Sequence, residues 1–305
     1  MPRTPLVLLA LLTASCASAP HAVERKPLFQ HWIDGTDPAE PQTQLQRYDA
    51  DTFIVRQSVL TNPEAPFLYL LFGKDRALLL DTGAGGLKIR PAIDAAISQW
   101  LAEHKRASIP LVVAHSHGHG DHHAGDAEFK DRPDTTIIGL QPTEVAAFFG
   151  ITDWPYTNAK FDLGGRVLDV IPTPGHHPAH IMLYDARTHL LFSGDTLYPG
   201  RIYIPANLLG DFKASMDRLA AFVEMHKVSH VLGAHIELTQ EPGVDFKQNA
   251  RNHPSEHVLE LPVADIAELH DAVTAMGTTA VRDVHDDFIV SPLPPRLPTP
   301  PPKAQ

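Results

Sequence analysis

Five histidines and one aspartate fall within nine residues of this chain, in the segment AHSHGHGDHHAG (residues 114–125). Imidazole and carboxylate groups together are typical ligands of divalent transition metals, above all zinc. Glycines alternate with the histidines, and such small residues allow several imidazoles to converge on one point. The spacing therefore favours a specific metal site, in which several side chains bind one ion, over the alternative of a histidine-rich surface tract that scavenges metal.

This segment directly follows an apolar run, residues 109–113, that is typical of a buried strand. The histidines therefore lie in the loop at the end of that strand. Because the first three histidines are evenly spaced, two registers are possible. Only one register gives the pattern His-x-His-x-Asp-His, with His117, His119, Asp121 and His122.

That pattern at the end of a strand resembles the signature of the metallo-β-lactamase superfamily. The resemblance implies two adjacent metal sites, with the first two histidines of the pattern on one metal and the Asp-His pair on the other. Further segments match the family in its own order. The PGH segment carries His176, the SGD segment carries Asp195, and a short apolar run ends at His235, although the flanking glycines of the family's Gly-His-Gly are not both kept.

The resemblance implies a role for each of these residues. The implied first-site ligands are His117, His119 and His176, the second-site ligands are Asp121, His122 and His235, and Asp195 bridges the two metals. As cofactors we expect two zinc ions per chain. Three neutral imidazoles leave the first ion an open position, where bound water acquires a pKa of about 7 and becomes a hydroxide nucleophile. We count Asp121 among the catalytic residues as well as among the ligands.

Other polar residues near these motifs fall outside the ligand pattern. Asp81, in a DTG turn after residues 77–80, is expected to support the metal loop, as in the superfamily. His115 and His123 fall outside the pattern and are interpreted as supporting or surface residues. For His177 and His180 the sequence leaves open a substrate-contacting role, a supporting role or a merely polar position.

The substrate class follows from the residue at the bridging position. Classical zinc β-lactamases of the superfamily carry cysteine or serine there, so Asp195 makes the chain resemble the lactonase, thioesterase and esterase branches. Tyr198 stands where lactonases of the superfamily have a tyrosine that contacts the substrate carbonyl, although packing against the sheet edge is an equal alternative. We expect an ester or lactone hydrolase, with Tyr198 as a second catalytic residue.

Alternative functions remain open at this point. They are β-lactam hydrolysis, glyoxalase II-like thioester hydrolysis, and a metal-binding protein that kept the fold without catalysis. A mononuclear iron oxygenase needs only one metal site, so the second ligand set argues against it. The formal net charge of -11 argues against a nucleic-acid partner, and we expect a small-molecule substrate.

The first residues have the features of a targeting segment. Arg3 is followed by an apolar run at residues 6–12 and by small residues up to position 19, which predicts a signal peptide at residues 1–19 and export to the periplasm or beyond. The apolar run is shorter than the roughly 20 residues of a membrane span. Cys16, the single cysteine, offers lipid attachment as an alternative. If the signal peptide is removed together with Cys16, the mature chain has no cysteine and therefore no thiolate ligand or disulfide.

Strand-like and helix-like segments alternate along the rest of the chain, which predicts an α/β fold. The resemblance implies a four-layer αββα sandwich in a catalytic domain of residues 27–290. Helices are expected at residues 87–104, 142–149, 214–226 and 262–276, and a closing strand at residues 279–290. Seven prolines in residues 291–305 predict an extended, disordered tail.

Overall fold

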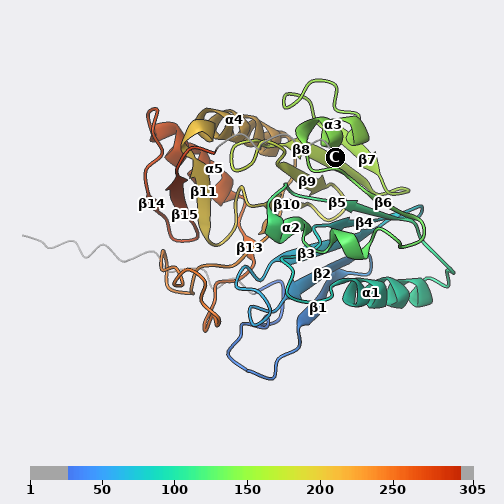
Figure 1. The fold of residues 1–305 in the computed structure, drawn as a ribbon. Coiled ribbons are helices and arrows are strands. Elements are labelled where there is room, and N and C mark those ends of the chain that lie inside the picture. Colours follow the sequence, from blue (N-terminus) through green and yellow to red (C-terminus); the bar gives the residue numbers. More distant parts are fainter. Residues whose placement is uncertain (1–26, 297–305) are drawn as a thin grey trace, which may run out of the picture.

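The computed structural model describes residues 27–296 (Figure 1). The predicted signal peptide and Cys16 lie outside the described residues. Within the described range, no helix combines the length and apolar character needed to cross a membrane.

Two six-stranded sheets form the centre of the molecule. The first has the order β1-β2-β3-β4-β5-β6 and the second β13-β12-β10-β9-β8-β7. The strands of the first sheet are β1 (Thr43–Asp49), β2 (Thr52–Gln57), β3 (Phe67–Phe72), β4 (Ala77–Leu80), β5 (Leu111–Ala114) and β6 (Thr135–Ile137). Those of the second are β7 (Ala159–Asp162), β8 (Val167–Pro172), β9 (Ile181–Asp185), β10 (Leu190–Gly194), β12 (His230–Gly233) and β13 (Glu260–Leu261).

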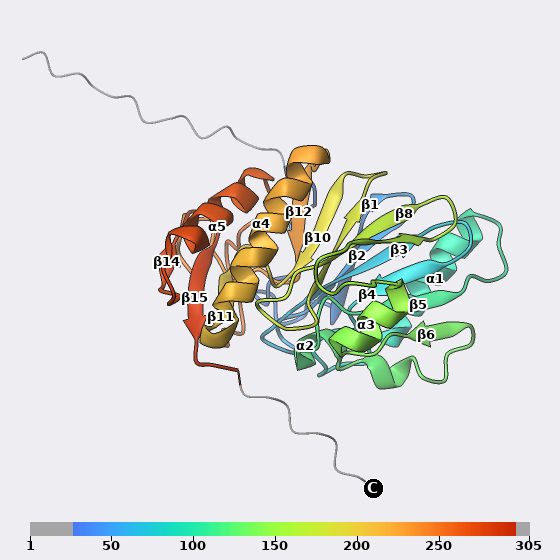
Figure 2. The ribbon, with the colours of Figure 1, turned by 90° about the horizontal axis from the view of Figure 1, so that it is seen from above.

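Helices cover the outer faces of both sheets (Figures 1 and 2). Helix α1 (Arg90–Glu103) packs on the first sheet, whereas α4 (Leu209–Met225) and α5 (Ala264–Ala275) pack on the second. The short α2 (Gly120–His123) and α3 (Pro142–Phe149) lie in connections, together with two 3-10 turns, Asp126–Glu128 and Ala206–Leu208. The predicted αββα sandwich is thus confirmed.

Alternation along the strands explains this layering, because successive side chains of a strand point to opposite faces. In β2, Ile54 belongs to the core between the sheets, whereas Phe53 and Val55 belong to the core under α1. Between the sheets, Tyr69 of β3 meets Phe192 of β10 with ring centroids 4.7 Å apart. Strands that are buried on both faces read as continuous apolar runs, which is why they stand out in the sequence.

A third, small sheet has the order β11 (Arg201–Pro205), β15 (Ile289–Leu293) and β14 (Asp283–Val284). The single closing strand predicted at residues 279–290 is wrong, because the chain turns back between β14 and β15, where the backbone N–H of His285 donates to the carbonyl oxygen of Phe288 (2.9 Å).

The predicted tail also begins too early, since residues 291–293 still pair with β11. Proline at position 292 is tolerated there because β14 pairs only with the first two residues of β15, which leaves one side of the strand as an edge.

The ends of several strands meet at one edge of the sandwich. Strands β4 and β5 are parallel, and β8, β10 and β12 also run in one direction, since β9 is antiparallel to both β8 and β10. The loop after β5 reaches the second sheet, where Ile181 N–H donates to the carbonyl oxygen of Ser116 (2.8 Å). The loops after these strands carry all seven predicted ligands.

Candidate metal centre

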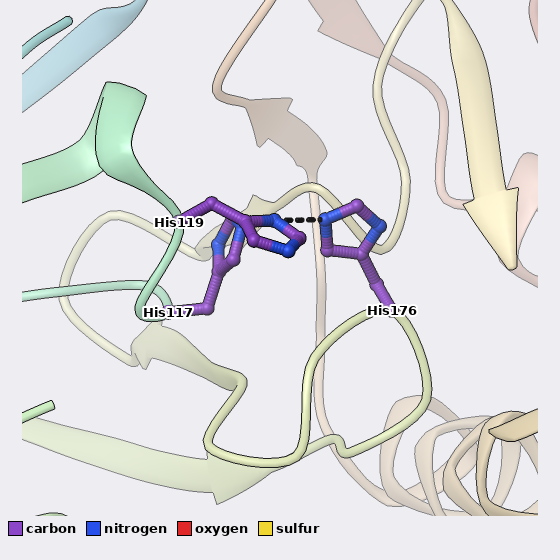
Figure 3. Close-up of side chains that lie close together, drawn as sticks. All are labelled: His117, His119 and His176. Carbon is purple, nitrogen blue, oxygen red and sulfur yellow. Dashed lines mark hydrogen bonds between the residues drawn. The ribbon is translucent and has the colours of Figure 1, made fainter. Parts of the chain in front are cut away.

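The loops after β5 and β8 bring three imidazoles together (Figure 3). Nδ1 of His119 lies 2.8 Å from Nε2 of His117 and 2.9 Å from Nε2 of His176. We call these residues the first cluster; their facing nitrogens all lie within 4.8 Å of one another. Three ring nitrogens that converge in this way are a donor set suited to a divalent transition metal.

A second cluster lies beside the first and consists of Asp121, His122, Asp195 and His235. The first two residues are in α2, and the others follow β10 and β12. Oδ2 of Asp121 lies 3.3 Å from Nε2 of His122 and 3.5 Å from Nε2 of His235. This set adds carboxylate oxygens to imidazole nitrogens, which is also a donor set for a transition metal.

Asp195 faces both clusters. Its Oδ2 lies 3.5 Å from Nε2 of His176 and 3.8 Å from Nε2 of His117. Its Oδ1 lies 3.5 Å from Nε2 of His122 and 3.4 Å from Nε2 of His235. Oδ1 is buried and has no hydrogen-bond partner, although a buried acceptor is normally satisfied. A cation in the second cluster would satisfy it, so the residues present fit a metal.

Local backbone geometry places Asp195 at this point. Gly194, the last residue of β10, has φ +51°, and a Cβ there would come within 2.7 Å of His180 Nε2 and of Ser116 Cβ. His180 is fully buried, accepts the backbone N–H of Asp195 (3.2 Å), and is fixed on its other nitrogen by Thr173 Oγ1 (2.8 Å). The role of His180 that the sequence left open is thus a supporting one.

Asp81 fixes the metal loop from the adjacent strand β4. Its Oδ1 accepts the backbone N–H of Ser116 (2.7 Å), and its Oδ2 accepts Ser116 Oγ (2.9 Å) and lies 2.9 Å from Nδ1 of His122. The residue is buried and has φ +69°, a conformation that aspartate tolerates better than most residues. Asp81 therefore orients His122, in agreement with the supporting role expected of it.

Backbone carbonyl groups orient two other imidazoles. Nδ1 of His176 donates to the carbonyl oxygen of Tyr203 (2.8 Å), and Nδ1 of His235 donates to that of Glu64 (2.7 Å). In both rings the proton is held on Nδ1, and Nε2 is left free to face the clusters. The sequence could not predict these partners, because a carbonyl group carries no residue-specific signal.

The electrostatics of the two clusters differ. Burial lowers the pKa of His117 and of His176, and it lowers the pKa of His119 to about 3. The three imidazoles of the first cluster are therefore neutral at physiological pH, which is the form that binds metal.

The second cluster contains charged groups. Burial opposes the charged forms of His122 and His235, but Asp195 and Asp121 outweigh it and raise the pKa of both imidazoles. The same contacts outweigh burial at the two carboxyl groups and lower the pKa of each. Both carboxylates are thus ionised and available to a cation.

Three other histidines lie close to the clusters without joining them. His115 is buried, and its Nε2 is 2.8 Å from Oδ1 of Asp126. The ring of His123 lies 6.2 Å from that of His115. Nδ1 of His177 accepts the backbone N–H of Ala179 (3.0 Å). These contacts agree with supporting positions.

The contacts of the Tyr198 hydroxyl argue against the predicted catalytic role of this residue. The side chain is buried, its hydroxyl donates to the carbonyl oxygen of Arg201, and Glu237 Oε2 is a further 3.1 Å neighbour. A phenol has one proton to donate, so none remains for a substrate oxygen. The ring packs edge-on against His235 with centroids 5.6 Å apart. The packing alternative is the one that the contacts favour.

A cavity of about 230 Å³ is lined by residues that neighbour the ligands in sequence or contact them, although none of the seven ligands lines it. Its lining includes Glu64 and Tyr203, whose carbonyl groups orient the two imidazoles named above, and also Ile236, Lys247 and Asn249. The last two side chains come from the long connection between β12 and β13. Sequence reasoning singled out none of these five residues.

The family model described as "Metallo-beta-lactamase superfamily" matches residues 61–227, more than half of the chain. The chain belongs to this superfamily. It is accordingly a metal-dependent hydrolase, and the donor sets described above are ones that could hold metal ions.

Relatives and solved structures of the superfamily give further comparisons. The chain is 35% identical over 118 residues to a hydroxyacylglutathione hydrolase of Rhizobium meliloti, a match that spans 37% of this chain but only 43% of that protein. It is 27% identical over 207 residues to the human acyl-coenzyme A thioesterase MBLAC2, which covers 55% of this chain and 72% of that protein. A metallo-beta-lactamase from Pontibacter korlensis aligns with a TM-score of 0.47 and 19% identity, over 64% of this chain and 91% of the other.

Proposed function

We propose that this chain is a dinuclear zinc hydrolase that cleaves acyl bonds at a carbonyl carbon. In this proposal the first cluster and the second cluster each hold one ion, and Asp195 is shared between them. When bound, the two ions would activate water near neutral pH and polarise the carbonyl group of the substrate.

One observation carries this proposal above the others. The two carboxylate oxygens of Asp195 point to different clusters, and Oδ1 has no other partner. A carboxylate buried for structural reasons alone would be expected to have hydrogen bonds to both oxygens. In this proposal the side chains of the protein position the metal ligands and the substrate. Asp81 and His180 hold the ligands in place, and the cavity lined by Glu64 and Tyr203 receives the acyl group.

Within this class we place thioesters first. One relative reported above is named a hydroxyacylglutathione hydrolase and the other an acyl-coenzyme A thioesterase, and an acylglutathione, like an acyl-coenzyme A, is a thioester. The lactone and simple-ester alternative shares the same carbonyl chemistry. Its particular support was the hydroxyl of Tyr198, which the Arg201 carbonyl occupies. Export from the cytoplasm, with loss of the N-terminal segment, remains part of the proposal. Mass spectrometry of the mature N-terminus tests it, and an intact Met1 would refute it.

The test is a substrate panel with zinc-loaded protein of known metal content. The panel holds a glutathione thioester, an acyl-coenzyme A, an aryl ester, a lactone and a β-lactam, with Asp195→Asn as the matched inactive control. We expect turnover of the acyl esters, highest with a thioester, and loss of all of it in the variant. Turnover of the β-lactam alone would replace the acyl-ester proposal, and no turnover at full zinc occupancy would favour a binding protein.

A further inference from the structure

The last described residue of the chain reaches the metal centre. Nη1 of Arg296 lies 2.6 Å from Nε2 of His119. The backbone of Arg296 is held on both sides by Asn207, whose Oδ1 accepts its N–H (2.7 Å) and whose Nδ2 donates to its carbonyl oxygen (3.2 Å). In Figure 2 the dark red segment after β15 turns toward α2, the helix that follows His119. Two independent anchors thus place this guanidinium beside the first cluster.

Arg296 differs from the other arginine near the centre in having no counter-ion. Arg201 pairs with Glu237 (2.6 Å) and Asp245 (3.0 Å) and is neutralised by them. Within residues 27–296, no carboxylate lies within ion-pair distance of Arg296. Arginine stays protonated under all ordinary conditions. A half-buried guanidinium without a counter-ion, in contact with a residue of the first cluster, is suited to pair with an anion.

The contact between Arg296 and His119 is incompatible with ligation of a metal ion by the first cluster. Arginine has donors only, so Nε2 of His119 accepts this hydrogen bond and the imidazole proton lies on Nδ1. That same Nδ1 faces His117 and His176. A metal ion held by the three rings would need the lone pair of Nδ1, and neutral His119 would then carry its proton on Nε2. Arg296 would lose its acceptor and be left as a free cation beside the loaded centre.

We propose that Arg296 anchors an anionic group on the acyl part of the substrate, so that the preferred substrates are esters or thioesters of acids with a second, negatively charged terminus. This inference rests on the proposed hydrolase function. The planar fork of the guanidinium fits a carboxylate or a phosphate through two parallel hydrogen bonds. The inference thus concerns an oxyanion, and the experiment distinguishes the two kinds.

The experiment compares matched 4-nitrophenyl esters on zinc-loaded protein. They are the succinate half-ester, the 3-phosphonopropanoate ester and the neutral butyrate ester. We expect the unmodified protein to prefer one anionic ester over the butyrate. Arg296→Gln should lower kcat/KM for that ester by roughly 10- to 100-fold, mainly through KM, and leave the butyrate unchanged. Arg296→Lys should restore part of the preference. Lys105→Gln, an exposed residue just after α1, controls for the loss of one positive charge.

A second arm measures binding without catalysis. Calorimetry on zinc-loaded protein compares succinamate with succinamide, its neutral near-isostere. Arg296→Gln should abolish the preference for succinamate and keep the zinc content unchanged, since the loaded centre no longer uses this contact. If no ester is cleaved but the binding preference depends on Arg296, the anchor stands and the hydrolase proposal fails. Equal loss on charged and neutral probes, an unchanged preference in Arg296→Gln, or loss of zinc in that variant would overturn the anchor.

Discussion

The first and second clusters lie side by side and both face Asp195, but their ligands differ in charge. The first has three imidazoles that burial keeps neutral, and its only negative charge comes from Asp195. The second has two ionised carboxylates among its own members, Asp121 and Asp195.

The groups that orient the imidazoles differ less. His122 of the second cluster contacts the carboxylate of Asp81, whereas His176 of the first cluster and His235 of the second both donate to backbone carbonyl groups. An ion bound mostly by neutral ligands would keep more of its positive charge and would polarise a substrate carbonyl group more strongly. An ion bound by carboxylates would be held more tightly and would polarise the carbonyl group less.

Asp195→Asn should have the largest effect. It removes the only negative charge from the first cluster, whereas the second keeps Asp121. We expect zinc content to fall from about two ions to about one per chain, and kcat/KM to fall by more than the roughly 10- to 100-fold typical of residues that only support ligands. Asp126→Asn, which alters the nearby pair with His115 outside both clusters, is the control. Full occupancy in Asp195→Asn would contradict the shared role.

His119→Ala and His235→Ala should each remove the ion of one cluster and leave the other. Both variants should lose most activity while retaining about one zinc per chain, as elemental analysis and kinetics together would measure. His177→Ala is the matched control, because its ring lies 5.0 Å from that of His119 but outside the cluster. Equal losses in His177→Ala and His119→Ala would mean that the first cluster is wrongly assigned.

Asp81→Asn should act mainly through the second cluster, although Asp81 also holds Ser116, whose Oγ lies 3.1 Å from Nδ1 of His117 in the first cluster. Asparagine tolerates the positive φ of this position, but its amide group replaces the carboxylate oxygen that faces His122. We expect metal affinity to weaken by roughly 10- to 100-fold, measured by competition with a chromophoric chelator. A loss of affinity confined to the ion of the first cluster would show that Asp81 supports that cluster instead of the second.

Tyr198→Phe should have the smallest effect on catalysis. The hydroxyl that it removes is bonded to the carbonyl oxygen of Arg201. We therefore expect kcat to stay within about twofold and the free energy of unfolding to fall by about 1 kcal/mol, as for a typical hydrogen bond. A tenfold or larger decrease in kcat at full zinc occupancy would restore the catalytic role that the sequence suggested.

The layered fold could be predicted because its signals are local. Strands β3 and β4 are continuous apolar runs, and α3 has a proline in its first turn and a glycine after its end. The break between β14 and β15 carries no glycine or proline, only the charged segment HDDF (residues 285–288), so two strands read as one. The proline-rich composition hid the pairing of residues 291–293 in the same way.

In the candidate site, the sequence predicted which side chains would meet but not how they are held. The ligand motifs are short patterns at strand ends, and the folded chain brings all seven residues into two adjacent clusters. The carbonyl groups of Glu64 and Tyr203 and the guanidinium of Arg296 come from tertiary packing. Arg296 is 177 positions from His119, in a segment that the sequence assigned to a tail. No local pattern could connect them.

We propose above that the two clusters hold two zinc ions that share Asp195. Elemental analysis of the full-length protein, purified without chelators, tests it most directly, with Asp195→Asn prepared in parallel. We expect close to two zinc ions per chain, and about one in the variant. A single tightly bound iron with no zinc, or the same metal content in both proteins, would contradict it.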